Sequence, residues 1–280
     1  MSSKQLYRAA HNVKSKLPLS SGLRLFTSSN IVSAKRCGSR QTLKMQKKAD
    51  QEPRERKKLL VVGLGNPGDK YTWTRHNAGF LAADELAQRL GAPLAAKSAF
   101  LGEYGSANFA GKSIGILKPK TYMNRSGESI RKVMEYFKIP AQDVLVLVDE
   151  VAIDYGTLRL KAKGSPGGHN GLKSCQQMMG TQDYPRLRIG VGGPKSDLVN
   201  HVLGEFSRQE RNDLDLFISK TAEAAEMWIQ EDDIQKVMNH CNAAVNQPLA
   251  PPPPTKLKKT QKREEASAAI KSSSSSNSAN

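Results

Sequence analysis

Leu59-Leu-Val-Val-Gly-Leu64, followed at once by Gly-Asn-Pro-Gly68, is the stretch that decides the fold. A continuous apolar run of this length before a Gly-Pro turn predicts a strand that is buried on both faces. Four further short segments have the composition of strands: Ser113–Leu117, Val144–Val148, Leu158–Lys161 and Leu187–Val191.

Segments with helical periodicity alternate with these strands. They are Ala78–Leu90, which ends at Gly91, then Ser126–Phe137, Leu172–Met179, and a longer acidic stretch from Ser207 to about Cys241. Strands interleaved with helices predict an α/β fold. We therefore expect a single domain over residues 58–246, with a mostly parallel, twisted mixed sheet covered by helices on both faces.

The positive charge of the chain lies mostly outside this domain. The 280 residues include 43 Lys and Arg and 26 Asp and Glu, a net charge of +17. Residues 58–246 hold 23 basic and 21 acidic residues and are nearly neutral. The overall charge is therefore no argument by itself for a nucleic-acid partner.

Residues 1–49 have the composition of an organellar transit peptide. They contain 11 basic residues, nine Ser and no acidic residue, and Leu6, Ala10, Val13 and Leu17 form one helical stripe between the basic positions. This pattern predicts import into a mitochondrion or chloroplast. A disordered basic arm that binds RNA is the alternative, and Met45 is a possible second start for a cytosolic form.

The remaining parts outside the domain carry little chemistry. Residues 50–57 are a linker, and residues 247–280, rich in Pro, Lys and Ser, are expected to be disordered. No run of 18 apolar residues occurs, so we expect no membrane span. Three widely spaced cysteines, Cys37, Cys175 and Cys241, offer neither a disulfide framework nor a zinc pattern and indicate a reducing compartment.

Charge is polarised within the domain. Residues 156–195 contain seven basic residues and one acidic residue, whereas residues 205–233 contain nine acidic and three basic residues. A basic segment beside an acidic one predicts a phosphate-binding face, although an ordinary solvated surface is the alternative.

The Gly-x-Gly-x-x-Gly pattern at Gly63–Gly68 also occurs in dinucleotide-binding turns. Its context here is poor, because Pro67 does not suit the opening of a helix, and Asp84 and Glu85 fall inside a helix rather than at a strand end. The glycines are better explained by a tight turn that presents Asn66 at the end of the first strand.

Polar side chains follow several of the predicted strands: Asn66, His76, Asn124, Asp149 and Asn170. One imidazole, one carboxylate and three amides, without a Ser or Cys elbow motif, are suited to hydrolysis by an activated water. A metal site is less favoured because the histidines lack ligand spacing. His76 as a surface or capping residue and Asp149 as a helix cap are the structural alternatives.

Five ordered motifs carry a resemblance to a known family: Gly-Leu-Gly-Asn66-Pro-Gly, Tyr71-x-x-Thr-Arg-His76-Asn, Lys-Pro-x-Thr-Tyr-Met123-Asn124-x-Ser-Gly, Gly-Ser-x-Gly-Gly-His-Asn170-Gly-Leu and Arg186-Leu-Arg188-Ile-Gly. Together, over about residues 58–240, they resemble the bacterial-type peptidyl-tRNA hydrolases. The resemblance implies a monomeric α/β enzyme, needing no metal, cofactor or protein partner, that hydrolyses the ester between a peptide and the tRNA 3′ ribose.

The resemblance also implies roles for individual residues. His76 is the base that activates water and Asp149 orients it, while Asn66 and Asn124 hold the peptide and the water. The resemblance assigns the remaining substrate contacts as follows: Met123 lines the cleft, Asn170 contacts the peptide or the oxyanion, Tyr71 stops the tRNA 3′ end, and Lys161 and Arg188 hold tRNA phosphates.

The sequence departs from the family pattern at Ala152, where a second Asp is common, at Arg125, which replaces an apolar residue, and at Pro166 in the glycine-rich loop. None removes a proposed catalytic group, but Ala152 leaves the electrostatics around Asp149 open. Because some plastid relatives act in intron splicing, a non-catalytic, RNA-binding group II intron splicing factor of the same fold is the alternative function.

Overall fold

The computed structural model describes residues 56–193 and 197–244. The predicted transit peptide at 1–49, nearly all of the linker and the tail at 247–280 lie outside the described residues.

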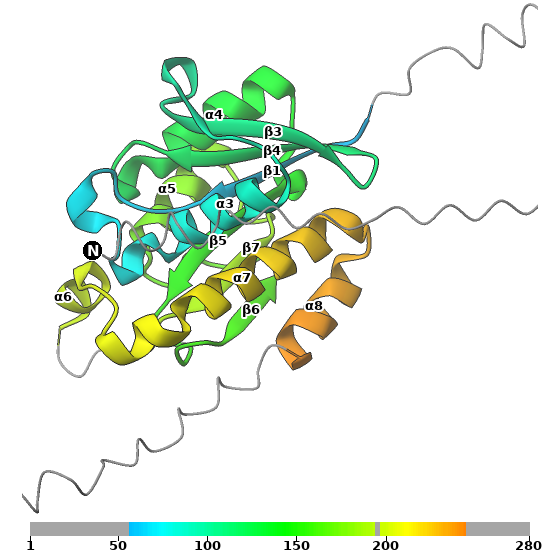
Figure 1. Cartoon of the computed structure of the whole chain (residues 1–280). Helices are drawn as coiled ribbons and strands as arrows, with labels where there is room; N and C mark the ends of the chain where they lie inside the picture. The colour runs from blue at the N-terminus through cyan, green and yellow to red at the C-terminus, as the bar shows by residue number, and fades with distance from the viewer. Residues whose placement is uncertain (1–55, 194–196, 245–280) are drawn as a thin grey trace, which may run out of the picture. The chain divides into compact units, whose positions relative to one another are not determined.

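The described residues form one seven-stranded sheet in the order β2-β3-β4-β1-β5-β7-β6 (Figure 1). The strands are β1 (Lys58–Gly63), β2 (Ala95–Lys97), β3 (Gly102–Phe109), β4 (Lys112–Pro119), β5 (Val144–Glu150), β6 (Leu158–Lys161) and β7 (Arg186–Gly190). The four central strands, β4, β1, β5 and β7, are parallel. The edge pairings β2–β3, β3–β4 and β6–β7 are antiparallel, so the parallel character predicted for the sheet belongs to its centre.

The apolar run of β1 is explained by burial on both faces of the sheet. Leu59 and Val61 pack into one hydrophobic cluster, whereas Leu60 and Val62 pack into a second cluster on the opposite face. Because successive strand residues point to opposite faces, a strand covered on both sides needs apolar residues at every position.

Helices cover both faces, as predicted. The helices are α3 (Ala78–Arg89), α4 (Ser126–Phe137), α5 (Asn170–Met179), α6 (Leu198–Leu203), α7 (Arg208–Gln230) and α8 (Ile234–Ala244). Residues of α3, α7 and α8 join the Leu59 cluster, and residues of α4 and α5 join the Leu60 cluster. Figure 1 shows α7 running across one side of the sheet with α8 beside it.

Local signals explain where the helices begin and end. Helix α4 has the predicted bounds and ends at Lys138, which adopts a left-handed conformation with φ of 55°. Helix α7 begins at a capping box in which the Ser207 hydroxyl accepts from the Glu210 N–H and the Glu210 carboxylate accepts from the Ser207 N–H. The predicted stretch from Ser207 to Cys241 is therefore two helices, separated at Glu231–Asp233.

The sequence did not predict β2, β3 or α6. Strand β3 is only half buried and contains Gly102 and Gly105, so it lacks the continuous apolar run that marks the central strands. Strand β4 runs on to Pro119, past the predicted end at Leu117. No helix in the described ranges combines the length and apolar character needed to cross a membrane.

Candidate active site

The polar residues predicted from the sequence gather near the carboxyl ends of the central parallel strands. Asn66 follows β1, Met123 follows β4, and Asp149 lies near the end of β5. His76 lies in the short 3-10 helix η2 (Arg75–Asn77), directly before α3. Ligands of open α/β sheets bind outside this edge, where loops from several strands meet.

His76 and Asp149 form a hydrogen-bonded pair. His76 Nδ1 lies 2.9 Å from Asp149 Oδ2 and 3.1 Å from Oδ1. An ionised carboxylate only accepts hydrogen bonds, so the neutral imidazole carries its proton on Nδ1 and leaves the Nε2 lone pair free. Within the described part of the chain His76 Nε2 makes no hydrogen bond. The pair thus has the geometry of a base and its orienting group.

His169 also binds Asp149, and sequence reasoning did not assign it to the site. His169 Nε2 lies 3.0 Å from Asp149 Oδ1, and the two imidazole ring centroids are 5.0 Å apart. In the sequence, the only indication that His169 belongs to the site is its place in the glycine-rich loop beside Asn170. It lies 20 residues after Asp149 in a loop, so no helical or strand periodicity links the two residues.

The two imidazoles determine the ionisation of Asp149. The Asp149 side chain is 2% exposed, and burial alone would raise the pKa of its carboxyl group. Interactions with His169 and His76 outweigh that burial and hold the pKa of Asp149 well below its usual range. Asp149 is therefore a carboxylate at neutral pH.

Asn66 is fixed so that its amide NH₂ group remains available. Its Oδ1 accepts from the Met123 N–H at 2.9 Å. The backbone of Asn66 is held by Asn77, whose Oδ1 accepts from the Asn66 N–H at 2.8 Å and whose Nδ2 donates to the Asn66 carbonyl at 3.0 Å. Among the described residues Asn66 Nδ2 has no partner, so it can donate to a bound molecule. Asn77, which sequence reasoning also missed, positions it.

The other predicted substrate residues lie nearby without contacting the His–Asp pair. Met123 is buried against Gly171, where an added Cβ would lie 2.6 Å from its sulfur. Asn124 and Asn170 are exposed, and their side chains make no hydrogen bond within the described ranges. Tyr71 is half-buried, with the Lys70 ammonium 4.7 Å from its ring centroid. Of the predicted catalytic residues, Asn66, His76 and Asp149 are held by side-chain hydrogen bonds.

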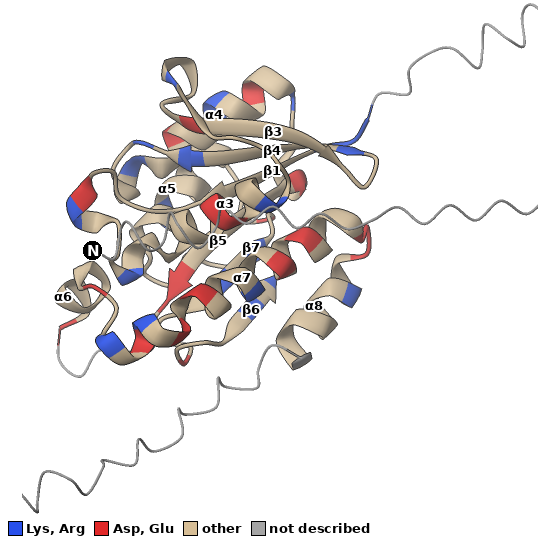
Figure 2. Cartoon of the chain, in the orientation of Figure 1, with Lys and Arg blue, Asp and Glu red and all other residues tan. Residues whose placement is uncertain are grey.

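The basic segment presents less surface charge than its sequence suggests. Lys161 is exposed, with no ion pair to any described residue. Arg188 donates to Glu150 and to the Ser165 carbonyl, so much of its guanidinium is already engaged. Arg186 is fully buried, where it donates to the carbonyls of Gly164 at 2.5 Å and Gln182 at 2.8 Å. Figure 2 shows acidic residues along α7, which belongs to the acidic segment that the sequence contrasts with the basic one.

The departures from the family pattern do not disturb the His–Asp pair. Arg125 forms an ion pair with Glu128 in the first turn of α4, at 2.7 Å. The Ala152 N–H donates to Glu150 Oε1 at 3.2 Å, and Asp154 is exposed. The hydrogen-bond partners of Asp149 are thus two imidazoles, and position 152 supplies no second carboxyl group.

His76, Asp149 and His169 could in principle hold a cation, because their ligand atoms lie within 4.8 Å of one another. Their protons argue against it. His169 Nδ1 accepts from the N–H groups of Gly171 and Leu172 at 3.1 and 3.3 Å, so its proton is on Nε2 and points at Asp149. The cluster is a chain of hydrogen bonds rather than a prepared metal site.

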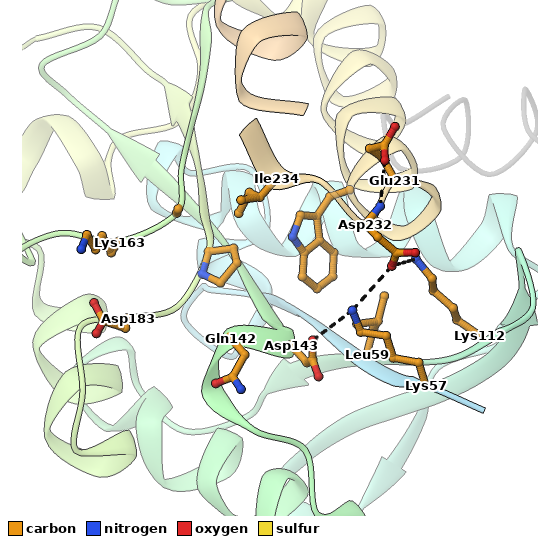
Figure 3. Close-up of a pocket in the computed structure, with 13 residues that line it drawn as sticks. Lys57, Leu59, Lys112, Gln142, Asp143, Lys163, Asp183, Glu231, Asp232 and Ile234 are labelled. Carbon is orange, nitrogen blue, oxygen red and sulfur yellow. Dashed lines mark hydrogen bonds and ion pairs between the residues drawn. The ribbon is translucent and has the colours of Figure 1, made fainter. Parts of the chain in front are cut away.

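A hollow of about 390 Å³ opens at the opposite edge of the sheet, where the parallel strands begin (Figure 3). Its wall includes Leu59, Trp228 and Ile234. Figure 3 shows two of the lining lysines, Lys57 and Lys112, paired with acidic residues, Lys57 with Asp143 and both lysines with Asp232. None of the predicted site residues lines it.

Residues 60–249 match the family model described as peptidyl-tRNA hydrolase. A peptidyl-tRNA hydrolase of Caldicellulosiruptor bescii is 46% identical over 186 residues, covering 66% of this chain and 97% of that protein. That of Bacillus cereus strain Q1 is 47% identical, covering 66% and 99%. This chain belongs to the peptidyl-tRNA hydrolase family.

The solved structures agree with this membership. The crystal structure of peptidyl-tRNA hydrolase from Acinetobacter baumannii superposes with a TM-score of 0.63 at 37% identity, covering 66% of this chain and 94% of that one. The family resemblance drawn from the five motifs is therefore confirmed, and so is the α/β fold with a mixed sheet.

Proposed function

We propose that this peptidyl-tRNA hydrolase family member cleaves the ester bond of N-blocked peptidyl-tRNA with His76 as the general base. The observation that carries the mechanism is the Asp149 carboxylate, which accepts from His76 Nδ1 and thereby leaves Nε2 as an open base. Family membership supports the reaction.

The proposed reaction needs no covalent intermediate on the protein. His76 Nε2 takes a proton from water, and the water oxygen attacks the carbonyl carbon of the ester. The tetrahedral oxyanion then collapses, and the 3′ ribose oxygen leaves with the proton carried by the imidazolium. Asn66 Nδ2, the amide donor left open, would hold the water or the peptide, or stabilise the oxyanion.

The cysteines of the described ranges do not offer an alternative nucleophile. Cys175 and Cys241 are both buried. Burial raises the pKa of the Cys175 thiol to about 12 and that of Cys241 to about 11, so neither is a thiolate at neutral pH. This supports direct attack by water.

Substrate contacts assigned by the resemblance remain part of the proposal. Asn124, Asn170 and Tyr71 would contact the peptide or the tRNA 3′ end, and Lys161 and Arg188 the phosphates. Phosphate contacts carry no base-sequence information, so many tRNAs would be accepted. We propose that a monomer suffices, which light scattering of the purified chain would test.

The function is tested by incubating the purified chain with an N-acetyl-aminoacyl-tRNA, with and without EDTA. We expect release of the N-acetyl amino acid and of intact tRNA at the same rate in both. Firm RNA binding without any ester hydrolysis would instead support the splicing-factor alternative, and loss of the reaction in EDTA would contradict the metal-free mechanism.

We further propose that the enzyme acts in organellar translation, on the basis of the acid-free composition of residues 1–49. A fusion of residues 1–50 to a fluorescent protein would distinguish mitochondrion from chloroplast. A fusion that stays wholly cytosolic would contradict import, and translation started at Met45 would yield a cytosolic form.

A further inference from the structure

We infer that His169 is a positioning residue, a neutral imidazole that holds Asp149 in the orientation in which it binds His76. This rests on the proposed function. The Asp149 carboxylate accepts a hydrogen bond from His169 Nε2 on Oδ1, at 3.0 Å, and one from His76 Nδ1 on Oδ2, at 2.9 Å. A carboxylate anchored at both oxygens cannot rotate about its terminal bond, so the direction of the bond to His76 is fixed.

The tautomer of His169 follows from its other nitrogen. Nδ1 is the N-terminal cap of α5 and accepts from the N–H groups of Gly171 and Leu172. Backbone N–H groups only donate, so Nδ1 carries a lone pair and the single proton of the neutral ring is on Nε2. A second proton on Nδ1 would point at two donors and break the cap. The start of α5 therefore keeps His169 as a donor to Asp149.

Gly171 makes room for this arrangement. A Cβ at Gly171 would lie 3.0 Å from His169 Cε1 and 2.6 Å from Met123 Sδ. His169 is therefore placed by three constraints: the cap of α5, the close approach of Gly171 and the bond to Asp149 in β5. Because its Nε2 proton faces the carboxylate, His169 orients the base through Asp149 and does not itself face the open nitrogen of His76.

Two substitutions separate the cap from the bond to Asp149. In His169→Asn the side-chain oxygen takes the place of Nδ1, and Asn is among the best N-cap residues, so the cap stays while the donor to Asp149 is lost. In His169→Gln the longer amide places its NH₂ group near the position of Nε2, so the donor stays while the cap is lost.

We expect His169→Asn to keep the melting temperature of the wild type and to lower kcat about 10- to 100-fold with KM nearly unchanged, as for loss of one hydrogen bond to a charged group. His169→Gln should melt lower but recover most of the kcat that His169→Asn loses. Equal losses of kcat in both variants, or full activity in His169→Asn, would overturn the inference.

The tautomer is tested without any activity measurement. In the full-length protein labelled with ¹⁵N-histidine, long-range ¹H–¹⁵N spectra should show His169 protonated on Nε2 and not on Nδ1 at pH 7. A proton on Nδ1, or a change at both nitrogens when Zn²⁺ is added, would overturn it in favour of a different tautomer or a metal site. If wild-type protein failed to hydrolyse the ester, the proposed function would fall while this spectrum still decided the hydrogen-bond assignment.

Discussion

The parallel strands begin at one edge of the sheet and end at the other, the carboxyl edge. Both of these edges gather charged and polar residues, but the residues are paired differently at each. At the edge where the parallel strands begin, Lys112 Nζ donates to Asp232 Oδ1 and to the Ile229 carbonyl, each at 2.7 Å, and Lys57 lies 3.5 Å from Asp143. Every one of these contacts joins opposite charges or caps the end of α7.

At the carboxyl edge no Lys or Arg of the described residues pairs with the buried carboxylate of Asp149. It accepts from two imidazoles, and these leave His76 Nε2 without a partner among the described residues. The hollow of about 390 Å³ lies at the first edge, yet the open base lies at the second. The candidate active site is therefore marked by a polar atom that the fold leaves without a hydrogen bond, and not by the hollow with the larger volume of empty space.

The largest expected effect comes from removing the open base. His76→Ala should lower kcat roughly 10²–10⁴-fold, because general-base catalysis is lost. The affinity for tRNA should stay nearly unchanged, since His76 is not among the proposed phosphate contacts. Single-turnover hydrolysis and a tRNA binding titration would check this, and wild-type turnover in His76→Ala would break the distinction between the edges.

Asp149→Asn should have a smaller effect, about 10- to 100-fold on kcat. The amide keeps an acceptor for one imidazole but turns a donor toward the other, so the tautomer of His76 is disturbed while a base remains. The same single-turnover assay measures it. A loss as large as that of His76→Ala would show that Asp149 does more than orient the ring.

Lys112→Met sharpens the comparison from the other edge. It should leave kcat and KM unchanged but lower the free energy of unfolding by roughly 1–3 kcal/mol, since hydrogen bonds to the end of α7 and to Asp232 are lost. Urea unfolding and steady-state kinetics of the same preparation test both halves. A fall in kcat in the folded variant would show that the two edges are coupled.

The contribution of Asp149 to the unfolding free energy should be lost only at low pH. The pKa of Asp149 lies below its unfolded value of about 3.9, so its contribution to stability is present above that pH and is lost as pH falls through the lower, folded value. The difference in unfolding free energy between wild type and Asp149→Asn should therefore not narrow as the pH falls from 7 to 5. It should narrow at about pH 3. Narrowing already between pH 7 and 5 would contradict a lowered pKa, and Asp69→Asn, at an exposed carboxyl, is the control.

The smallest effect is expected at Lys161. Lys161→Ala should weaken binding to all tRNAs alike and reduce the slope of log Kd against log salt by about one, because one phosphate contact is lost. Lys97→Ala, at an exposed lysine on β2, is the matched control.

Arg188→Ala should also weaken tRNA binding. It removes contacts to Glu150 and Ser165 as well, so its effect on kcat is expected to be larger than that of Lys161→Ala. An effect confined to one tRNA would indicate base reading.

Much of this architecture could be predicted because it is recorded in local patterns. Strand β1 shows its two-sided burial as an unbroken apolar run, and α4 shows its period directly, so both were located within a residue. His169 could not be found this way, since its role depends on the ring orientation that capping α5 imposes. Arg186 was counted as surface charge, although the strand alternation of Arg186 and Arg188 is equally compatible with a pair of arginines that hold a loop.

Chemical rescue of His76→Ala by added imidazole tests the central claim most directly. If the carboxyl edge works by an open imidazole nitrogen, the ester hydrolysis rate of His76→Ala should rise with the concentration of neutral imidazole, whereas the wild type and Lys112→Met should not respond. A His76→Ala rate that ignores imidazole while the variant remains folded and binds tRNA would contradict the assignment of His76 as the base.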